Sequence, residues 1–123
     1  MGSSRTKVLA QLQDLQSRRQ GLLKTMTDSE QLIVGTVYDV LRRCGNPSCH
    51  CAEKPGHRQT LLIFVKKGKR VCKFVRLEDV DWVREAWKRY RVFKKDLRTI
   101  RTLQKRELKL LEAQMRQRHV SYE

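Results

Sequence analysis

Residues 60–76 read TLLIFVKKGKRVCKFVR, and this stretch decides the fold. Its first six residues are mostly apolar, and the β-branched and aromatic side chains among them favour strands. Residues 66–69, Lys-Lys-Gly-Lys, contain the glycine that a tight turn often requires. The run that follows, VCKFVR, has the two-residue period of a strand, with both valines on one face. The stretch therefore predicts a β-hairpin, with the turn type left open.

A third strand is expected before the hairpin. Residues 32–43 are again mostly β-branched or aromatic, with Ile33, Thr36, Val37 and Tyr38 as typical members. Three antiparallel strands are the simplest arrangement of the three runs.

A long helix should follow the hairpin. Residues 78–81, Glu-Asp-Val-Asp, place acids where the helix dipole favours them, and no glycine or proline occurs after them. Apolar side chains then recur every three or four positions. If unbroken to residue 118, the helix is roughly 60 Å long, which is more than a three-stranded sheet can cover. The apolar stripe comprises Val83, Ala86, Trp87, Tyr90, Phe93, Leu97, Ile100 and Leu103, and less regularly Leu108, Leu111 and Met115.

A second amphipathic helix is predicted over residues 5–26. Its apolar face cannot be stable alone, and Arg19 interrupts it. The face should pack on the far end of the C-terminal helix, or on a second copy of the chain as a coiled coil. We therefore expect a homodimer or a larger protein partner, bound through the C-terminal helix and through Val8, Leu12, Leu15 and Leu22.

The expected fold is α+β. It consists of an N-terminal amphipathic helix within residues 1–29, a three-stranded antiparallel sheet with a Cys-rich loop within residues 30–77, and a long basic helix within residues 78–123.

The loop between the first two strands carries metal-binding chemistry. Residues 44–51, CGNPSCHC, hold Cys44, Cys49 and Cys51, and His57 follows closely. Zinc prefers four thiolate or imidazole ligands in a tetrahedron. These residues predict a structural zinc knuckle, with Cys72 as the alternative to His57 for the fourth ligand. Cys72 lies within a predicted strand, so it is also expected as a small core side chain.

These features together resemble a group of small uncharacterised proteins of bacteria, archaea, phages and mobile elements. The resemblance covers roughly residues 33–100 and implies the same fold and knuckle, with Cys44, Cys49, Cys51 and His57 matching the group's motif. In that group Gly-Pro and an aromatic residue commonly follow the histidine, where this chain has Arg-Gln-Thr. The resemblance implies no established activity.

The charge points to a polyanionic partner. With 28 Lys and Arg against 13 Asp and Glu, the net charge is +15. We expect binding to DNA or structured RNA, mainly through phosphates. The candidate residues lie beside the knuckle, on the hairpin and along one helix face: Arg42, Arg43, Arg58, Lys66, Lys67, Lys69, Arg70, Lys73, Arg84, Lys88, Arg91, Lys95, Arg98, Arg101 and Lys105.

Enzyme motifs are not evident in the sequence. The acids are dispersed or placed at a helix start, and no phosphate-binding glycine loop or nucleophile motif is visible. We therefore expect a non-catalytic accessory protein, with a protein-interaction adaptor as the alternative. Since no apolar run reaches about 20 residues and no signal peptide is evident, we expect an intracellular protein of the cytoplasm or nucleoid, with no membrane span.

Overall fold

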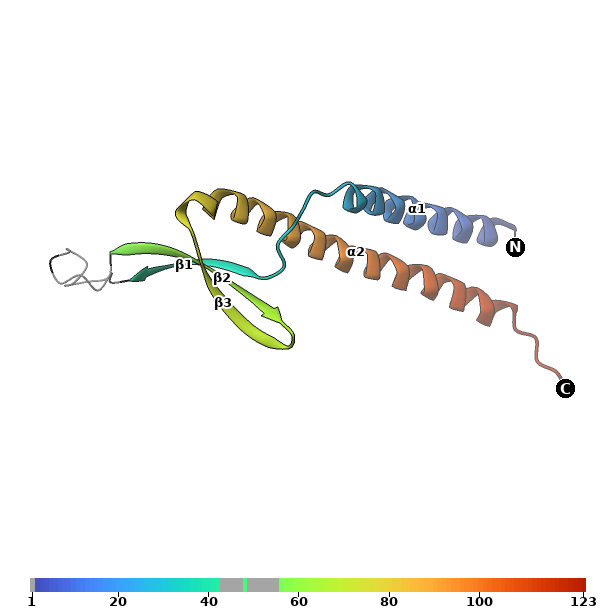
Figure 1. Cartoon of the computed structure of the whole chain (residues 1–123). Helices are drawn as coiled ribbons and strands as arrows, with labels where there is room; N and C mark the ends of the chain where they lie inside the picture. Colours follow the sequence, from blue (N-terminus) through green and yellow to red (C-terminus); the bar gives the residue numbers. More distant parts are fainter. Residues whose placement is uncertain (1, 43–47, 49–55) are drawn as a thin grey trace. The chain divides into compact units, whose positions relative to one another are not determined.

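The computed structural model describes residues 2–42, 48 and 56–123 (Figure 1). Helix α1 spans Gly2–Thr27, and strands β1, β2 and β3 span Thr36–Arg42, His57–Lys66 and Lys69–Val75. A short 3-10 helix, η2 (Leu77–Asp79), leads into helix α2 (Val80–Arg118). The strands form one antiparallel sheet with β2 in the middle. The predicted α+β fold is thus confirmed.

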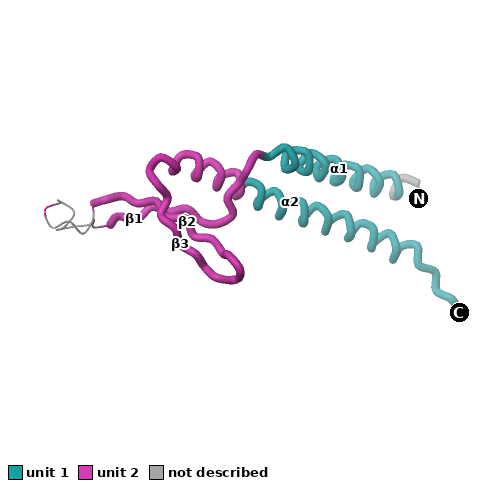
Figure 2. Tube along the Cα trace, viewed as in Figure 1, with its two compact units in different colours: residues 1–29, 92–123 teal, residues 30–91 magenta. Residues whose placement is uncertain are grey.

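The chain divides into two compact units (Figure 2). Unit 1 comprises Met1–Ser29 and Val92–Glu123, which contain α1 and most of α2. Unit 2 is Glu30–Arg91, which contains the sheet and the first turns of α2.

The core of unit 2 lies between the start of α2 and the sheet. Val83 and Ala86 of α2 are 4% and 3% exposed, and Val37 and Leu61 of the sheet are likewise buried. The register pairs Val37 with Leu62 and Tyr38 with Leu61, so Val37 and Leu61 lie on opposite faces of the sheet. Helix α2 covers the Val37 face, because Arg84 of α2 bonds Asp39 two residues further along β1.

The first strand begins four residues later than the sequence suggested. Residues before it run along α2, because the Ile33 amide donates to the Ala86 carbonyl (3.1 Å) and the Trp87 indole N–H donates to the Gly35 carbonyl (2.8 Å). Gly35 has φ 154°, and a Cβ there would stand 2.5 Å from the Ile63 carbonyl oxygen. A glycine is therefore needed where the chain turns into β1.

In unit 1, α1 runs antiparallel to α2 (Figure 1). Leu15 and Met26 of α1 and Ile100 and Leu103 of α2 are buried, so the N-terminal helix packs on its own chain. Arg19, which interrupts the apolar face, pairs with Glu107 (Nε–Oε1 3.1 Å). Binding of a second copy or another protein through the apolar face of α1 stays a prediction.

The prediction of which residues continue the apolar face of α2 beyond Leu103 is wrong. Leu108, Leu111 and Met115 are 59%, 52% and 66% exposed, whereas Gln114 is buried and Glu107 half-buried. From Leu103 the face toward α1 continues in steps of four and three residues through 107, 110 and 114. Leu108, Leu111 and Met115 each follow one of these positions by one residue, so they point about 100° around the helix from the face toward α1.

No helix in the described part of the chain is long and apolar enough to cross a membrane.

Candidate nucleic-acid interface

The hairpin turn holds a lysine in an unusual backbone conformation. Lys66 pairs with Lys69 across a two-residue turn, Lys67-Gly68. Both turn residues have positive φ, 51° at Lys67 and 77° at Gly68, as in a type I′ turn. Asparagine or glycine normally occupies the first position, because a side chain such as lysine costs about 1 kcal/mol in the left-handed region. The turn thus carries a positive charge at the expense of backbone stability.

The hairpin is rich in cations and lacks acids. From residue 57 to residue 76 the sequence holds seven Lys or Arg residues and no Asp or Glu. Five of the seven lie at or near the turn, and all five are exposed. We call them the hairpin cations: Lys66, Lys67, Lys69, Arg70 and Lys73.

One face of the sheet adds exposed aromatic rings. The strand register places Tyr38, Leu61 and Phe74 side by side, and Phe74 is 62% exposed. The Arg42 guanidinium lies 5.0 Å from the centroid of the Phe74 ring. Phe74 was not among the predicted site residues; the signal for it in the sequence is its alternation with Val71 and Val75, which puts it on the opposite face of β3.

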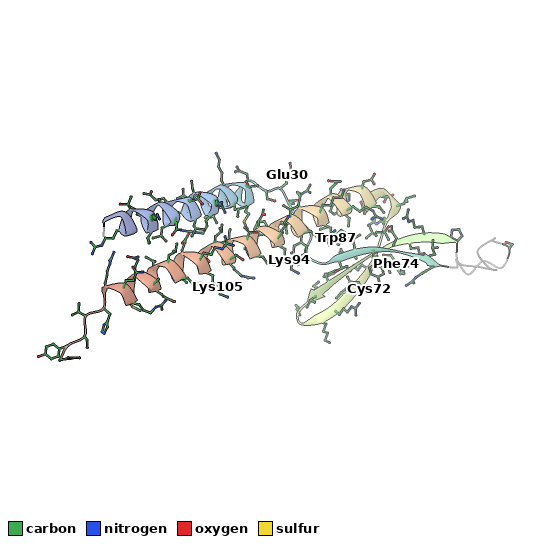
Figure 3. The ribbon with its side chains drawn as sticks, turned by 180° about the vertical axis from the view of Figure 1, so that it is seen from behind. Glu30, Cys72, Phe74, Trp87, Lys94 and Lys105 are labelled. Carbon is green, nitrogen blue, oxygen red and sulfur yellow. The ribbon has the colours of Figure 1, made fainter. Side chains whose placement is uncertain are left out.

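Cys72 is not a core side chain. It is a free, exposed cysteine on the edge strand β3, visible beside Phe74 in Figure 3. The expectation of burial was wrong because Cys72 and Phe74 lie on the exposed face of β3, whereas Val71 and Val75 on the other face are half-buried. Cys72 pairs with Ile63, six residues along β2 from His57, so the two side chains are about 20 Å apart. They cannot ligate the same metal ion.

The zinc knuckle falls mostly outside the described residues. Cys44, Cys49 and Cys51 lie there, as does Arg43. His57 is the first residue of β2, paired with Arg42, and is half-buried. Among the described residues no group of three His, Cys, Asp or Glu could hold a metal ion.

Two of the arginines predicted to bind phosphates, Arg58 and Arg84, pair with the same carboxylate in unit 2. Arg84 donates to both carboxylate oxygens of Asp39 (2.6 and 2.7 Å), and the Arg58 Nε lies 3.2 Å from the same carboxylate. The Thr60 hydroxyl also donates to Asp39 (2.8 Å). Hydrogen bonds from Arg84, and then from Thr60, hold the pKa of Asp39 below its usual value. Asp39 was not singled out in the sequence, because an acid within a strand looks like a surface residue.

The other predicted phosphate-binding residues of α2 lie partly in unit 2 and partly in unit 1. In unit 2, Lys88 lies 3.4 Å from Glu85, and the Arg91 guanidinium lies 4.9 Å from the Trp87 ring centroid. In unit 1 the remaining cations are exposed, and two of them line a groove described below: Lys95, Arg98, Arg101 and Lys105.

Comparison with known protein families gives one match. Residues 12–85 match a domain of unknown function (DUF6788). The chain belongs to this family. The match runs from α1 to the first turns of α2 and includes the hairpin and the Cys-rich segment. No curated protein and no solved structure matches the chain.

Proposed function

We propose that the chain is a non-catalytic nucleic-acid-binding protein that contacts DNA or structured RNA through the hairpin cations. The observation that supports this best is Lys67, a cation held in a left-handed turn position that would be more stable with another residue. Unfavourable backbone conformations of this kind are concentrated at functional sites.

Electrostatics supports the same surface. Each phosphate neutralised by Lys or Arg releases condensed counterions, which drives binding. The hairpin cations have no acid between residues 57 and 76 to oppose them, whereas Arg84 and Arg58 are already paired with Asp39. The hairpin is therefore a stronger candidate for phosphate contacts than the start of α2.

Phe74 and Arg42 extend the proposed surface to bases. Unpaired bases stack on exposed aromatic rings and on guanidinium planes, and such stacking tolerates any sequence. A hairpin can also follow the backbone of a duplex or enter a groove. We expect phosphate contacts to dominate affinity in either case.

The proposal includes a structural zinc ion. Cys44, Cys49, Cys51 and His57 supply the thiolate and imidazole ligands that zinc prefers, and His57 begins the strand that the Cys-rich loop enters. The ion would hold the loop at the end of the sheet opposite the hairpin turn.

A charge-reversal experiment tests the proposed surface. Lys67→Glu, Lys69→Glu and Arg70→Glu together should weaken binding about 100-fold near physiological salt, since three phosphate contacts are lost. The matched control, Arg5→Glu, Lys7→Glu and Arg116→Glu, removes the same charge from exposed positions of unit 1. We expect the control to lose only a fewfold. Equal losses in both variants would mean that net charge, and not the hairpin, governs binding.

A second candidate function is self-association through unit 1. Among the large apolar side chains exposed there, six share one feature of position: Leu9, Leu23, Leu97, Leu108, Leu111 and Met115. All follow a core-facing position by one residue, so in an antiparallel pair they lie on the same side. A chain of charge +15 repels its copy, so apolar contacts on this side would have to outweigh the repulsion between the chains, including that of Arg5 and Arg118 beside Leu9 and Met115.

A further inference from the structure

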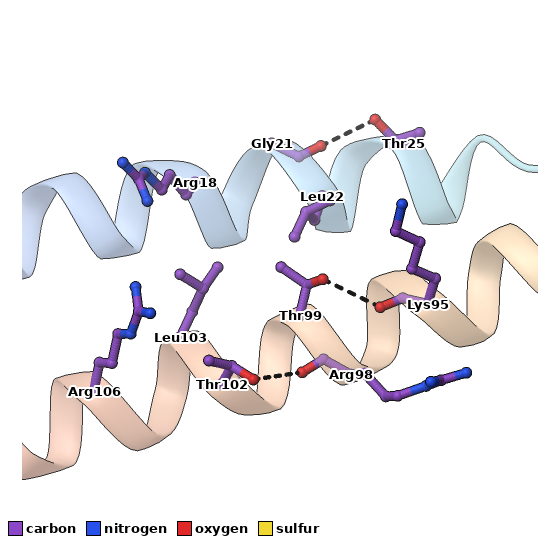
Figure 4. A pocket seen from close by; sticks show the side chains of 10 residues that line it. All are labelled: Arg18, Gly21, Leu22, Thr25, Lys95, Arg98, Thr99, Thr102, Leu103 and Arg106. Atoms are coloured by element: carbon purple, nitrogen blue, oxygen red, sulfur yellow. Dashed lines mark hydrogen bonds between the residues drawn. The ribbon is translucent and has the colours of Figure 1, made fainter.

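Unit 1 contains a groove between α1 and α2 on the side away from the six exposed apolar residues. Its volume is about 680 Å³, and its walls come from residues 18–25 of α1 and 95–106 of α2 (Figure 4). Along α2 it extends about 17 Å, or three helical turns.

The floor of the groove is apolar. Leu22 and Leu103 both point into the space between the helices (Figure 4). The threonines that line it donate their hydroxyl hydrogens to their own helices: Thr25 to the Gly21 carbonyl (3.1 Å), Thr99 to that of Lys95 (3.2 Å) and Thr102 to that of Arg98 (3.1 Å). The hydroxyls are thus used within the helices, and the floor has no donor directed at a ligand.

The rim of the groove is cationic. Arg18, Lys95, Arg98 and Arg106 line it, and none of its ten lining residues is an acid. Arg18 has a neighbour in Asp14 (3.4 Å), but both side chains are more than 60% exposed, so the pair is weak. In the part of the chain that the structure describes, no ion pair joins Lys95, Arg98 or Arg106 to a carboxylate.

We propose that this groove binds an acidic amphipathic helix of a partner protein. A helix of about three turns would place apolar side chains over the half-buried Leu22 and carboxylates beside the four cations. It would complete a three-helix bundle, in which the groove between two helices is filled by a third.

Other occupants fit the groove less well. A phosphate backbone could contact the cations of the rim but would leave the apolar floor of the groove uncovered. A second copy of the chain would bring its own charge of +15 to a cationic rim. The most acidic stretch of the chain, residues 78–81, already forms the end of η2 and the first residues of α2, and it belongs to unit 2.

Gly21 leaves the groove open in the middle of α1. A Cβ at this position would meet no atom within 4 Å. A larger side chain there can therefore fill the groove without clashing with the chain itself and without changing any charge. Gly21→Leu should therefore block the groove, and Gly21→Ala is the control that adds only a methyl group.

The test uses the full chain and a fluorescein-labelled 14-residue peptide of Leu, Glu and Ala. Its leucines are spaced i, i+3, i+4 and i+7, and a scrambled peptide of the same composition is the control. We expect the amphipathic peptide to bind at least tenfold more tightly than the scrambled one. Gly21→Leu should weaken its binding at least tenfold, and Gly21→Ala should weaken it by less than threefold.

The same proteins separate this proposal from nucleic-acid binding. Gly21→Leu should bind an oligonucleotide like the wild type and should melt no lower, because leucine is the better helix former. The proposal is overturned if the scrambled peptide binds equally, if neither peptide binds up to about 1 mM, or if Gly21→Leu leaves peptide binding unchanged. It is also overturned if an oligonucleotide competes with the peptide and Gly21→Leu weakens both, since the groove would then be a nucleic-acid site. Failure of the hairpin variant to lose nucleic-acid affinity would leave these outcomes unaffected.

Discussion

At the scale of single residues, Lys67 links stability to the proposed function. Its φ of 51° suits asparagine better than lysine. We expect Lys67→Asn to raise the free energy of unfolding by about 1 kcal/mol and to weaken nucleic-acid binding severalfold. Thermal melts and anisotropy titrations measure the two effects. If the variant is more stable and binds as tightly as the wild type, the lysine does not contact the nucleic acid.

Asp39 makes stability depend on pH. Because hydrogen bonds from Arg84 and Thr60 lower the pKa of the folded-state carboxyl, its contribution is fully present above the unfolded-state value near pH 4. That contribution is lost as the pH falls from there through the folded-state pKa. We expect Asp39→Asn to lower Tm at pH 7, with the difference from the wild type shrinking below about pH 4. A difference that stays constant from pH 7 to pH 3 would contradict the role of this carboxylate.

At the scale of elements, α2 leaves part of its apolar surface uncovered. Leu111 and Met115 are exposed on the side opposite the groove. If that side binds a second copy, the wild type should sediment as a dimer at tens of micromolar. Leu111→Gln with Met115→Gln should then sediment as a monomer and keep its helical content. A monomeric wild type at these concentrations would exclude self-association through this side.

The Cys-rich loop is the element whose chemistry follows from sequence alone. We expect the purified chain to hold one zinc ion, measured by elemental analysis, and to release it when Cys49→Ser and Cys51→Ser are introduced together. Cys72→Ser should retain the metal, because Cys72 lies about 20 Å along the sheet from His57. Loss of zinc from the Cys72 variant would contradict this ligand set.

The same elements show what the sequence could predict and what it could not. Periodicity located both helices and the hairpin, because each has a face that must be buried. It missed the start of β1, where Trp87 and Ile33 tie residues 32–35 to α2 in place of a strand. It also missed the groove cations Arg18 and Arg106, since only the pairing of two helices distant in sequence brings them together.

At the scale of the whole molecule, the charge of +15 destabilises the folded state by self-repulsion unless a polyanion is bound. The internal pairs at Asp39 and Glu107 neutralise only a few of the 28 Lys and Arg residues. Nucleic acid on the hairpin and an acidic helix in the groove would each neutralise part of the remainder.

The most direct measurement is the salt dependence of binding. Fluorescence anisotropy would follow duplex DNA, single-stranded DNA and structured RNA with the zinc-loaded wild type and the triple hairpin variant. We expect tight binding of the wild type to at least one polymer, with log K falling against log salt at a slope of about −4, and a slope about 2 to 3 units shallower for the variant. Weak binding to all three polymers at 0.1 M salt, or a slope that the hairpin variant leaves unchanged, would contradict nucleic-acid binding through the hairpin.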